Sequence, residues 1–224
     1  MILPHAIIVL LTLGITPILS AQAPTILISG QHQFKKIEDF VPDPNVEGAY
    51  QRFESTVDMS LYLEGVEKPY KVRNANINLL DHSVLLGQGG STVFIRSAYV
   101  DSLSTSQLRL VHAKHLSPTA ADLLLQPLQH GAKVSLYKEV KMELLPPTYN
   151  ESLQIGNKNY TLERYITFYI LDPKSMLLPI SKNLKAFKNK PYFGALKKFV
   201  KSEKIDFDNE QHMLQIAAFL EKGE

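Results

Sequence analysis

The sequence predicts an α+β fold in which a mainly antiparallel β meander, or curved sheet, is followed by two or three C-terminal helices. Two observations carry this prediction. From about residue 52 to residue 180, apolar and polar residues alternate with a period of two, which is typical of half-buried strands. From Ser181 onward, the apolar residues recur at the spacing of amphipathic helices. Strands first and helices last is the order of an α+β protein.

The first predicted strands alternate clearly and are separated by turn residues. Apolar residues occupy every second position of Val57–Leu63, and Gly65–Pro69 then breaks the pattern. A turn is expected at Asp81-His82 and another at Gly87–Gly90. The strands around these turns are predicted at Tyr70–Leu80, Ser83–Leu86 and Val93–Ala98. Short runs separated in this way indicate an antiparallel meander.

Residues 101–130 allow two interpretations. A strand is expected around Leu108, Leu110 and His112. After it, Ser117 and Pro118 could open a short helix that ends at Leu125, with Ser117 as the cap. Alternatively, Ala121–Leu128 is a strand paired with Lys133–Leu144 across His130-Gly131, and Pro127 confines it to an edge or a bulge.

The clearest strand signal is Ala132–Leu144, in which the apolar residues fall on even positions. A helix would scatter this apolar set around its axis, so a strand is the consistent interpretation. Pro146-Pro147 ends the strand. Further strands are predicted at Leu153–Ile155, Tyr160–Leu171 and Met176–Ile180.

Three short helical segments are predicted at the C-terminus. Ser181 can cap the first of them, and Pro191 fits the first turn of the second. Asp208 can cap the third, with Gln211 at the capping-box position. Gly223 is expected to end that helix.

The C-terminal run YITFYILDPKSMLLPISKNLKAFKNKPYFGALKKFVKSEKIDFDNEQHMLQIAAFL is similar to the tail of a family of uncharacterised secreted proteins of Bacteroidetes-type bacteria. The segments FVPDPNVEGAY and LLLQPLQHGAKVSLYKEVKMEL also match that family's layout. The resemblance covers about residues 40–220 and is strongest over 130–220. It implies a β-rich fold and a periplasmic or outer-surface setting. The family carries no established activity, so the resemblance implies none.

The N-terminal 23 residues predict a secretory signal peptide. They contain no Lys, Arg, Asp or Glu, and a dense apolar stretch, Ala6–Leu13, precedes the small residues of Ser20–Ala23. A retained membrane anchor and a buried core segment are the alternatives. The predicted organisation is a signal peptide (1–23), an extended segment (24–51), an antiparallel β-rich domain (52–180) and a helical segment packed on the sheet (181–224).

Composition limits the chemistry that this chain can perform. The 224 residues include no cysteine, which excludes disulfides, thiol catalysis and thiolate metal sites. In an exported chain this absence suits a bacterial envelope. A net charge of +2 gives no general attraction to nucleic acid, so no nucleic-acid partner is expected.

Two histidines spaced as His112-x-x-His115 are a candidate metal site. On a helix the two imidazoles would share a face, whereas on a strand they point to opposite faces. No glutamate lies where a metalloprotease needs one. We therefore expect solvated or hydrogen-bonded histidines and predict no metal-ligating residue.

Two other motifs match ligand-binding loops only in part. Gly87–Gly90 has the glycines of a phosphate-binding loop, but Ser91-Thr92 then open a strand instead of a helix, so a hairpin turn is expected. Acidic residues alternate at Asp206, Asp208 and Glu210 as calcium ligands do. The glycine and glutamate that a calcium loop requires are absent, because Gln211 and Ala217 occupy those positions, so helix capping is expected.

Three polar surfaces have a binding and a structural interpretation. Lysines make the helical segment basic, which suits either a solvated face or a weak contact with an anionic membrane surface. Tyr165, Thr167 and Tyr169 share a strand face that could contact a ligand or be covered. Glu139 and Glu143 flank Lys141 on another face and predict cross-strand charge pairing. The lysines are Lys182, Lys185, Lys188, Lys190, Lys197, Lys198, Lys201 and Lys204.

No arrangement of a nucleophile, a base and an orienting group is evident in the sequence, so no catalytic residue, cofactor-binding residue or cofactor is predicted. We expect a secreted, non-enzymatic module of the bacterial envelope that binds a partner or serves a structural role. A periplasmic carrier of a hydrophobic ligand and an enzyme with a dispersed site are the alternatives. The partner and the oligomeric state are left unidentified.

Overall fold

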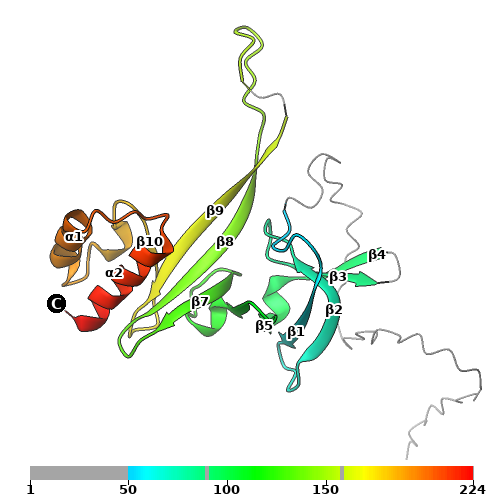
Figure 1. Ribbon diagram of the computed structural model, residues 1–224, viewed down its shortest axis with the longest axis horizontal. Helices are drawn as coiled ribbons and strands as arrows, with labels where there is room; N and C mark the ends of the chain where they lie inside the picture. Colours follow the sequence, from blue (N-terminus) through cyan, green and yellow to red (C-terminus); the bar gives the residue numbers. More distant parts are fainter. Residues whose placement is uncertain (1–49, 89–90, 157–158, 224) are drawn as a thin grey trace, which may run out of the picture.

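The computed structural model describes residues 50–88, 91–156 and 159–223 of the chain (Figure 1). Ten antiparallel strands form one sheet, and two α-helices follow at the C-terminal end. This confirms the predicted α+β class. The predicted signal peptide, and the predicted extended segment up to residue 49, lie outside the described residues.

The strands range from four to eleven residues in length, and β8 and β9 are the longest. The strands are β1 (Val57–Leu63), β2 (Tyr70–Ile77), β3 (Val84–Gln88), β4 (Ser91–Ile95), β5 (Val100–Ser104), β6 (Arg109–His112), β7 (Leu124–His130), β8 (Ser135–Leu145), β9 (Thr161–Leu171) and β10 (Leu177–Ile180). The helices are α1 (Phe193–Ser202) and α2 (Glu210–Lys222).

The chain runs back and forth through the sheet with one departure from sequential order. Strands β1 to β4 form a meander at one end, and β5 then returns to pair with β1. Strands β5 to β10 continue as a second meander to the other end. We call β1–β6 the N-terminal lobe, and β7–β10 with α1 and α2 the C-terminal lobe; Figure 1 shows them side by side along the long axis.

The N-terminal lobe is built on the alternation that the sequence predicts. Met59, Leu61 and Leu63 of β1 are buried, while the residues between them face outward. They pack against buried residues of β2 to β7, which close this core. The sheet therefore curves around an apolar interior of its own.

The C-terminal lobe has a separate core between the sheet and the helices. Leu136 of β8 and Ile170 of β9 are fully buried beneath α2, whose Met213 and Ile216 face them. Phe187, in a short 3-10 turn before α1, is also fully buried in this core. The apolar stripes of the helices are therefore used to cover the sheet.

Several local predictions are wrong. Ser117–Leu125 forms no helix; the strand interpretation holds, with β7 beginning at Leu124 and a bulge between Pro127 and Gln129. A proline at a bulge leaves no ladder hydrogen bond unmade. Leu153–Ile155 is a turn with one isolated bridge, from Ile155 to Asn150, instead of a strand.

The predicted caps also need correction. Asn209 caps α2, because its side-chain oxygen accepts from the backbone N–H of Gln211, whereas the N–H of Asp208 bonds back to Asp206. Asn209 sits one residue nearer the helix than Asp208 and reaches the free amides directly. Ser181 caps no helix, since only the 3-10 turn Lys185–Phe187 follows it, and Pro191 lies two residues before α1.

The last turn of α2 is attached to the β7–β8 turn through one carboxylate. Glu221 accepts hydrogen bonds from the backbone amides of Ala132, Lys133 and Val134, at 2.8 to 3.1 Å. Gly131 is needed beside it, because a Cβ atom there would collide with the carboxylate and with the carbonyl of Val134. These backbone hydrogen bonds, with Val134 first, lower the pKa of Glu221.

Glu221→Gln is expected to loosen this attachment. A glutamine amide offers one acceptor oxygen where the carboxylate offers two, and its NH2 group would face backbone donors. Hydrogen exchange should show faster exchange at Ala132, Lys133 and Val134. Glu203→Gln, an equal change at an exposed glutamate, should leave those amides protected. Equal protection in both variants would contradict the role of Glu221.

Candidate functional site

The two lobes meet at a buried polar cluster, which is the first candidate for a functional site. It comprises His82 from the β2–β3 turn, Glu139 of β8 and Tyr169 of β9, with Arg52 and Gln126 beside them. His82 and Glu139 are each only 4% exposed. Burial of two ionisable groups is uncommon unless both are paired.

His82 bridges the point at which β7 and β8 separate. Its Nδ1 accepts from the backbone N–H of Leu124 at 3.2 Å, so the neutral ring carries its proton on Nε2. Nε2 donates to the carbonyl of Val140, also at 3.2 Å. The neighbouring Leu79 carbonyl accepts from the N–H of Met142. Groups of the β2–β3 turn therefore form hydrogen bonds with the edge of β8 beyond the point where β7 stops pairing with it.

Glu139 lies beside this histidine and is held by a tyrosine. The Tyr169 hydroxyl donates to Oε2 of Glu139 at 2.7 Å, and Oε1 lies 3.9 Å from Nε2 of His82. Burial lowers the pKa of His82, and the Glu139 charge opposes that shift only in part. Burial and the same carboxylate raise the pKa of Tyr169. The result is a neutral histidine and a neutral tyrosine around one carboxylate.

Arg52 reaches the same junction from the segment that precedes β1. Its guanidinium donates to the Gln126 side chain on β7 at 3.2 Å. Burial, with the like charge of Arg164 second, lowers the pKa of Arg52 to about 10, so it stays charged at neutral pH. The backbone of Arg52 also bonds to Ile77 of β2. Arg52 thus connects the start of the fold to the C-terminal lobe.

The hydrogen bonds of this cluster attach the two lobes to each other. Both ring nitrogens of His82 are engaged by backbone groups, so the ring is not available as a base without breaking one of these bonds. Glu139 is the buried carboxylate beside His82, whereas Asp81, the exposed neighbour of His82 in the chain, is bonded to Ser83. The cluster explains how the lobes are joined.

The second candidate is the long β8–β9 hairpin, whose far half extends away from the rest of the molecule (Figure 1). Strands β8 and β9 pair over eleven residues each, from Ser135↔Leu171 to Leu145↔Thr161. We call the described residues of the far half of this hairpin, 143–156 and 159–163, the arm. Strand β7 pairs with β8 only up to Lys138, and β10 pairs with β9 only from Phe168.

The arm is therefore a two-stranded ribbon with open edges. Beyond Met142, no strand in the described part of the chain pairs with the outer edge of β8. From Thr161 to Thr167, none of the described strands pairs with the outer edge of β9. An isolated ribbon of two strands is marginally stable in water, and open edges are ready to accept another strand.

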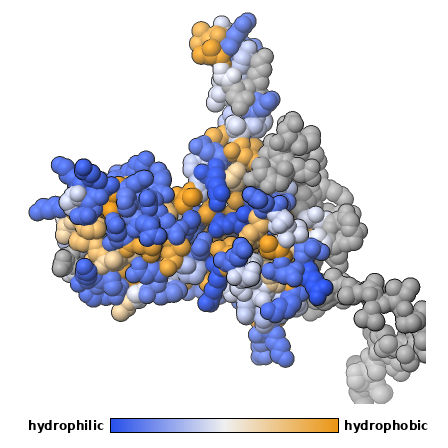
Figure 2. All heavy atoms as spheres, viewed as in Figure 1, coloured by the Kyte–Doolittle hydropathy of each residue, from blue (hydrophilic) through white to orange (hydrophobic). Residues whose placement is uncertain are grey.

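Apolar side chains gather on the arm. Leu153 and Ile155 at its tip are 65% and 60% exposed, and Leu144 and Tyr160 are exposed nearby. Figure 2 shows a hydrophobic patch at the end of the projection, away from the predominantly polar surface of the helices. Single exposed apolar residues are ordinary, but a group of them on a projecting element is typical of an interaction site.

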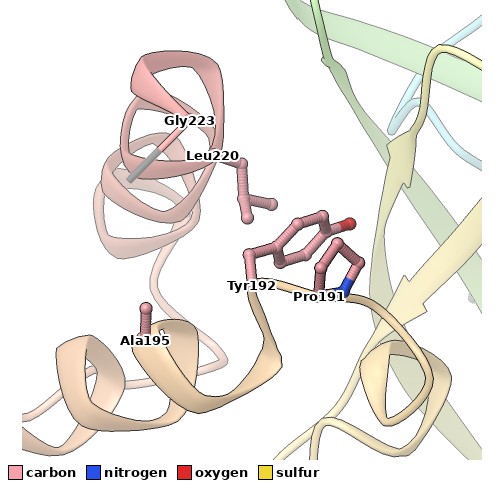
Figure 3. A pocket seen from close by; sticks show the side chains of 5 residues that line it. All are labelled: Pro191, Tyr192, Ala195, Leu220 and Gly223. Atoms are coloured by element: carbon pink, nitrogen blue, oxygen red, sulfur yellow. The ribbon is translucent and has the colours of Figure 1, made fainter.

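A shallow pocket of about 330 Å³ lies between α1 and α2 (Figure 3). The Tyr192 ring lies beside Pro191 and faces Leu220 across the pocket, with Ala195 and Gly223 completing the lining. Its volume is at the lower end of ligand pockets. It lies between the helices, whereas the space between sheet and helices is filled by the C-terminal core.

The two histidines of the candidate metal motif lie edge to face but have different surroundings. His112, at the end of β6, is fully buried, and its Nδ1 accepts from the N–H of Lys114. His115 is half exposed and contacts Asp101 at 2.7 Å. The ring centroids are 6.4 Å apart. Within the described ranges, no group of three or more His, Asp or Glu side chains is placed to hold a metal ion.

The remaining candidate motifs have structural roles. Strands β3 and β4 form the expected hairpin at the glycine-rich loop, of which residues 89 and 90 lie outside the described part. The acids before α2 are dispersed: Asp206 accepts from the N–H of Asp208, and Glu210 pairs with Lys138 at 2.8 Å. They do not converge on a common point.

The strand residues that the sequence offered as candidate contacts have different surroundings in the structure. Tyr169 is committed to Glu139, whereas Tyr165 is exposed and donates to Glu163. Lys141 pairs with Glu143 at 2.6 Å along the same strand, so the predicted charge pairing is within β8 instead of across strands. Glu139 takes no part in it.

Comparison with known proteins adds no family to this description. No family model, no curated protein and no solved structure matches the chain. Neither of the helices in the described ranges is long and apolar enough to cross a membrane. The family resemblance in the sequence therefore stays a prediction.

Neither the lobe junction nor the arm is predicted from the sequence. Asp81-His82 was interpretable only as a turn, and Glu139 only as one charge of an alternating strand. Glu139 shares the polar positions of β8 with Lys141 and Glu143, so no local sequence signal marked the junction. For the arm, the signal was the length of the two flanking strand patterns, since residues 146–160 contain Leu153 and Ile155 without any pattern that buries them.

Proposed function

We propose that this chain is a secreted, non-enzymatic module of the bacterial envelope, and that it binds a protein partner through the arm. The single observation that carries the proposal is the arm itself. It projects from the body, exposes apolar side chains at its tip and offers unpaired strand edges. A partner strand added to such an edge gains backbone hydrogen bonds, and pockets for alternate side chains give specificity.

The setting rests on the sequence. The charge-free apolar N-terminus, the absence of cysteine and the resemblance to secreted bacterial proteins all favour export to an envelope. N-terminal sequencing of the mature protein tests this part. A cleavage point within Ser20–Ala23 is expected, and a protein that begins at Met1 would remove the basis for an envelope setting.

The two alternatives receive less support from the geometry. A carrier needs an enclosed apolar cavity, whereas the space between sheet and helices is packed by side chains and the pocket between the helices is open and small. An enzyme needs ionisable groups that converge in a cleft, and His82 with Glu139 converge in a buried junction. Partner binding makes use of the arm, which neither alternative explains.

The double variant Leu153→Ser, Ile155→Ser tests the arm. The envelope of the source bacterium is solubilised mildly, the tagged mature protein is recovered, and native mass spectrometry identifies what it carries. The wild-type protein is expected to carry a defined protein partner, and the double variant is expected to lose most of it. Its fold should be retained, because both side chains are more than half exposed.

A matched control removes two exposed apolar residues elsewhere. Val66 lies after β1 and Met176 before β10, and they are 37% and 47% exposed. Val66→Ser, Met176→Ser should keep the partner. Loss of the partner in both variants would indicate non-specific binding through exposed apolar residues. A wild-type protein that carries lipid, or no protein at all, would contradict partner binding.

A further inference from the structure

The helical end of the C-terminal lobe carries a concentrated positive charge. Residues 182–204 contain eight lysines and one acidic residue, whereas the rest of the chain contains 16 basic and 21 acidic residues. The net charge of +2 therefore hides an uneven distribution. The chain is net negative outside this segment, so its charge is strongly polarised.

Seven of these lysines lie on the surface, and none of them pairs with an acidic side chain of the described residues. Lys190 is the exception, since it pairs with Asp172 at 2.5 Å. No carboxylate in the described part of the chain forms an ion pair with any of the other seven. We call these exposed residues the lysine face; they are Lys182, Lys185, Lys188, Lys197, Lys198, Lys201 and Lys204.

The apolar side of α1 packs in the C-terminal core. The lysine face can therefore contact the surface of a membrane, but α1 cannot insert into the bilayer. Leu196 is fully buried in the C-terminal core, and Phe193, Phe199 and Val200 pack against that core. Lys197, Lys198 and Lys201 point away from it and are exposed. Such a helix cannot bury an apolar stripe in a bilayer without leaving the sheet, but it can attract charge.

We propose that the lysine face binds the anionic headgroups of a phospholipid bilayer. Lysine is a compact point charge on a flexible stem, which suits a diffuse negative surface, whereas arginine forks suit fixed phosphate geometry. The lysine face contains no arginine. Each lysine near an anionic membrane strengthens binding several-fold, and the net negative remainder of the chain turns this face toward the bilayer.

This contact is independent of the arm and compatible with it. In Figure 1, α1 lies at one end of the molecule, and the arm projects from the middle of the sheet in another direction. A molecule bound through the lysine face therefore keeps the arm available. The proposed partner contact and the proposed membrane contact can fail separately.

Vesicle co-sedimentation of the purified mature protein tests the proposal. Vesicles that contain phosphatidylglycerol are compared with pure phosphatidylcholine vesicles, at low and at high salt. Binding is expected only to the anionic vesicles and only at low salt, because exposed charges are screened over about 10 Å at 0.1 M salt. The triple variant Lys197→Gln, Lys198→Gln, Lys201→Gln should bind on the order of 100-fold more weakly.

A control variant has the same change in net charge at another place. Lys68→Gln, Lys71→Gln, Arg73→Gln removes three exposed positive charges near the β1–β2 turn. This control should bind the anionic vesicles as the wild type does. Equal weakening in both variants would show an effect of net charge alone and would overturn the proposal. Equal binding to both vesicle types, or binding to duplex DNA in place of vesicles, would overturn it as well.

Discussion

Replacing Phe187 with alanine is expected to lower the free energy of unfolding by about 4 kcal/mol. Phe187 is the largest fully buried side chain of the described residues, and its ring lies 6.5 Å from that of Tyr192. It sits where the chain leaves β10 and turns toward α1, so it contacts both the sheet and the helices. Removal leaves a cavity that close-packed neighbours cannot fill.

Circular dichroism during urea unfolding is a suitable measurement. Both α-helices of the described chain belong to the C-terminal lobe, so the helical signal near 222 nm reports that lobe. Phe94→Ala is the matched control, because Phe94 lies on the edge strand β4 and is only partly buried. A loss of about 1 kcal/mol is expected there. Similar losses of unfolding free energy in the two variants would contradict the prediction that Phe187 contributes more to stability than Phe94.

The strands that the sequence predicted best are those whose two faces meet different surroundings. β1 alternates because one face is in the N-terminal core and the other is in water. On β8, Leu136 lies beneath α2, whereas Tyr137 is buried on the opposite face in a cluster with Leu125. Period-two patterns arise from this division, and β1 and β8 were accordingly placed almost correctly.

Features that depend on long-range contacts could not be predicted. Ser117–Leu125 has good helical start signals, yet β6 offers Val111 and His112 as pairing partners for the end of that segment. The long-range pairing outweighs the local preference. Similarly, the role of His82 depends on Leu124 and Val140, which are 42 and 58 residues away in the sequence. No local pattern encodes such a bridge.

His82→Asn is expected to lower the free energy of unfolding by about 3 kcal/mol at pH 7.5. Asparagine tolerates the left-handed backbone of this position, where φ is 58°, so backbone strain does not confuse the result. Its shorter side chain cannot satisfy both Leu124 and Val140, and each unsatisfied buried backbone group costs about 1–3 kcal/mol. Urea unfolding measures the loss. His115→Asn is the control, because that half-exposed histidine should cost less than about 1 kcal/mol.

The pH dependence of the same variant distinguishes a buried neutral histidine from an ion pair with Glu139. Burial lowers the pKa of folded His82 below the usual 6.5, so below that pH the unfolded chain binds a proton that the folded chain does not. Wild-type stability should therefore fall as the pH drops from about 6.5 toward the folded pKa. The His82→Asn variant lacks this contribution, so the difference between the two proteins should shrink in acid. If His82 and Glu139 formed a stabilising ion pair, the difference would grow as the pH falls, and the junction would have to be described as charge-paired.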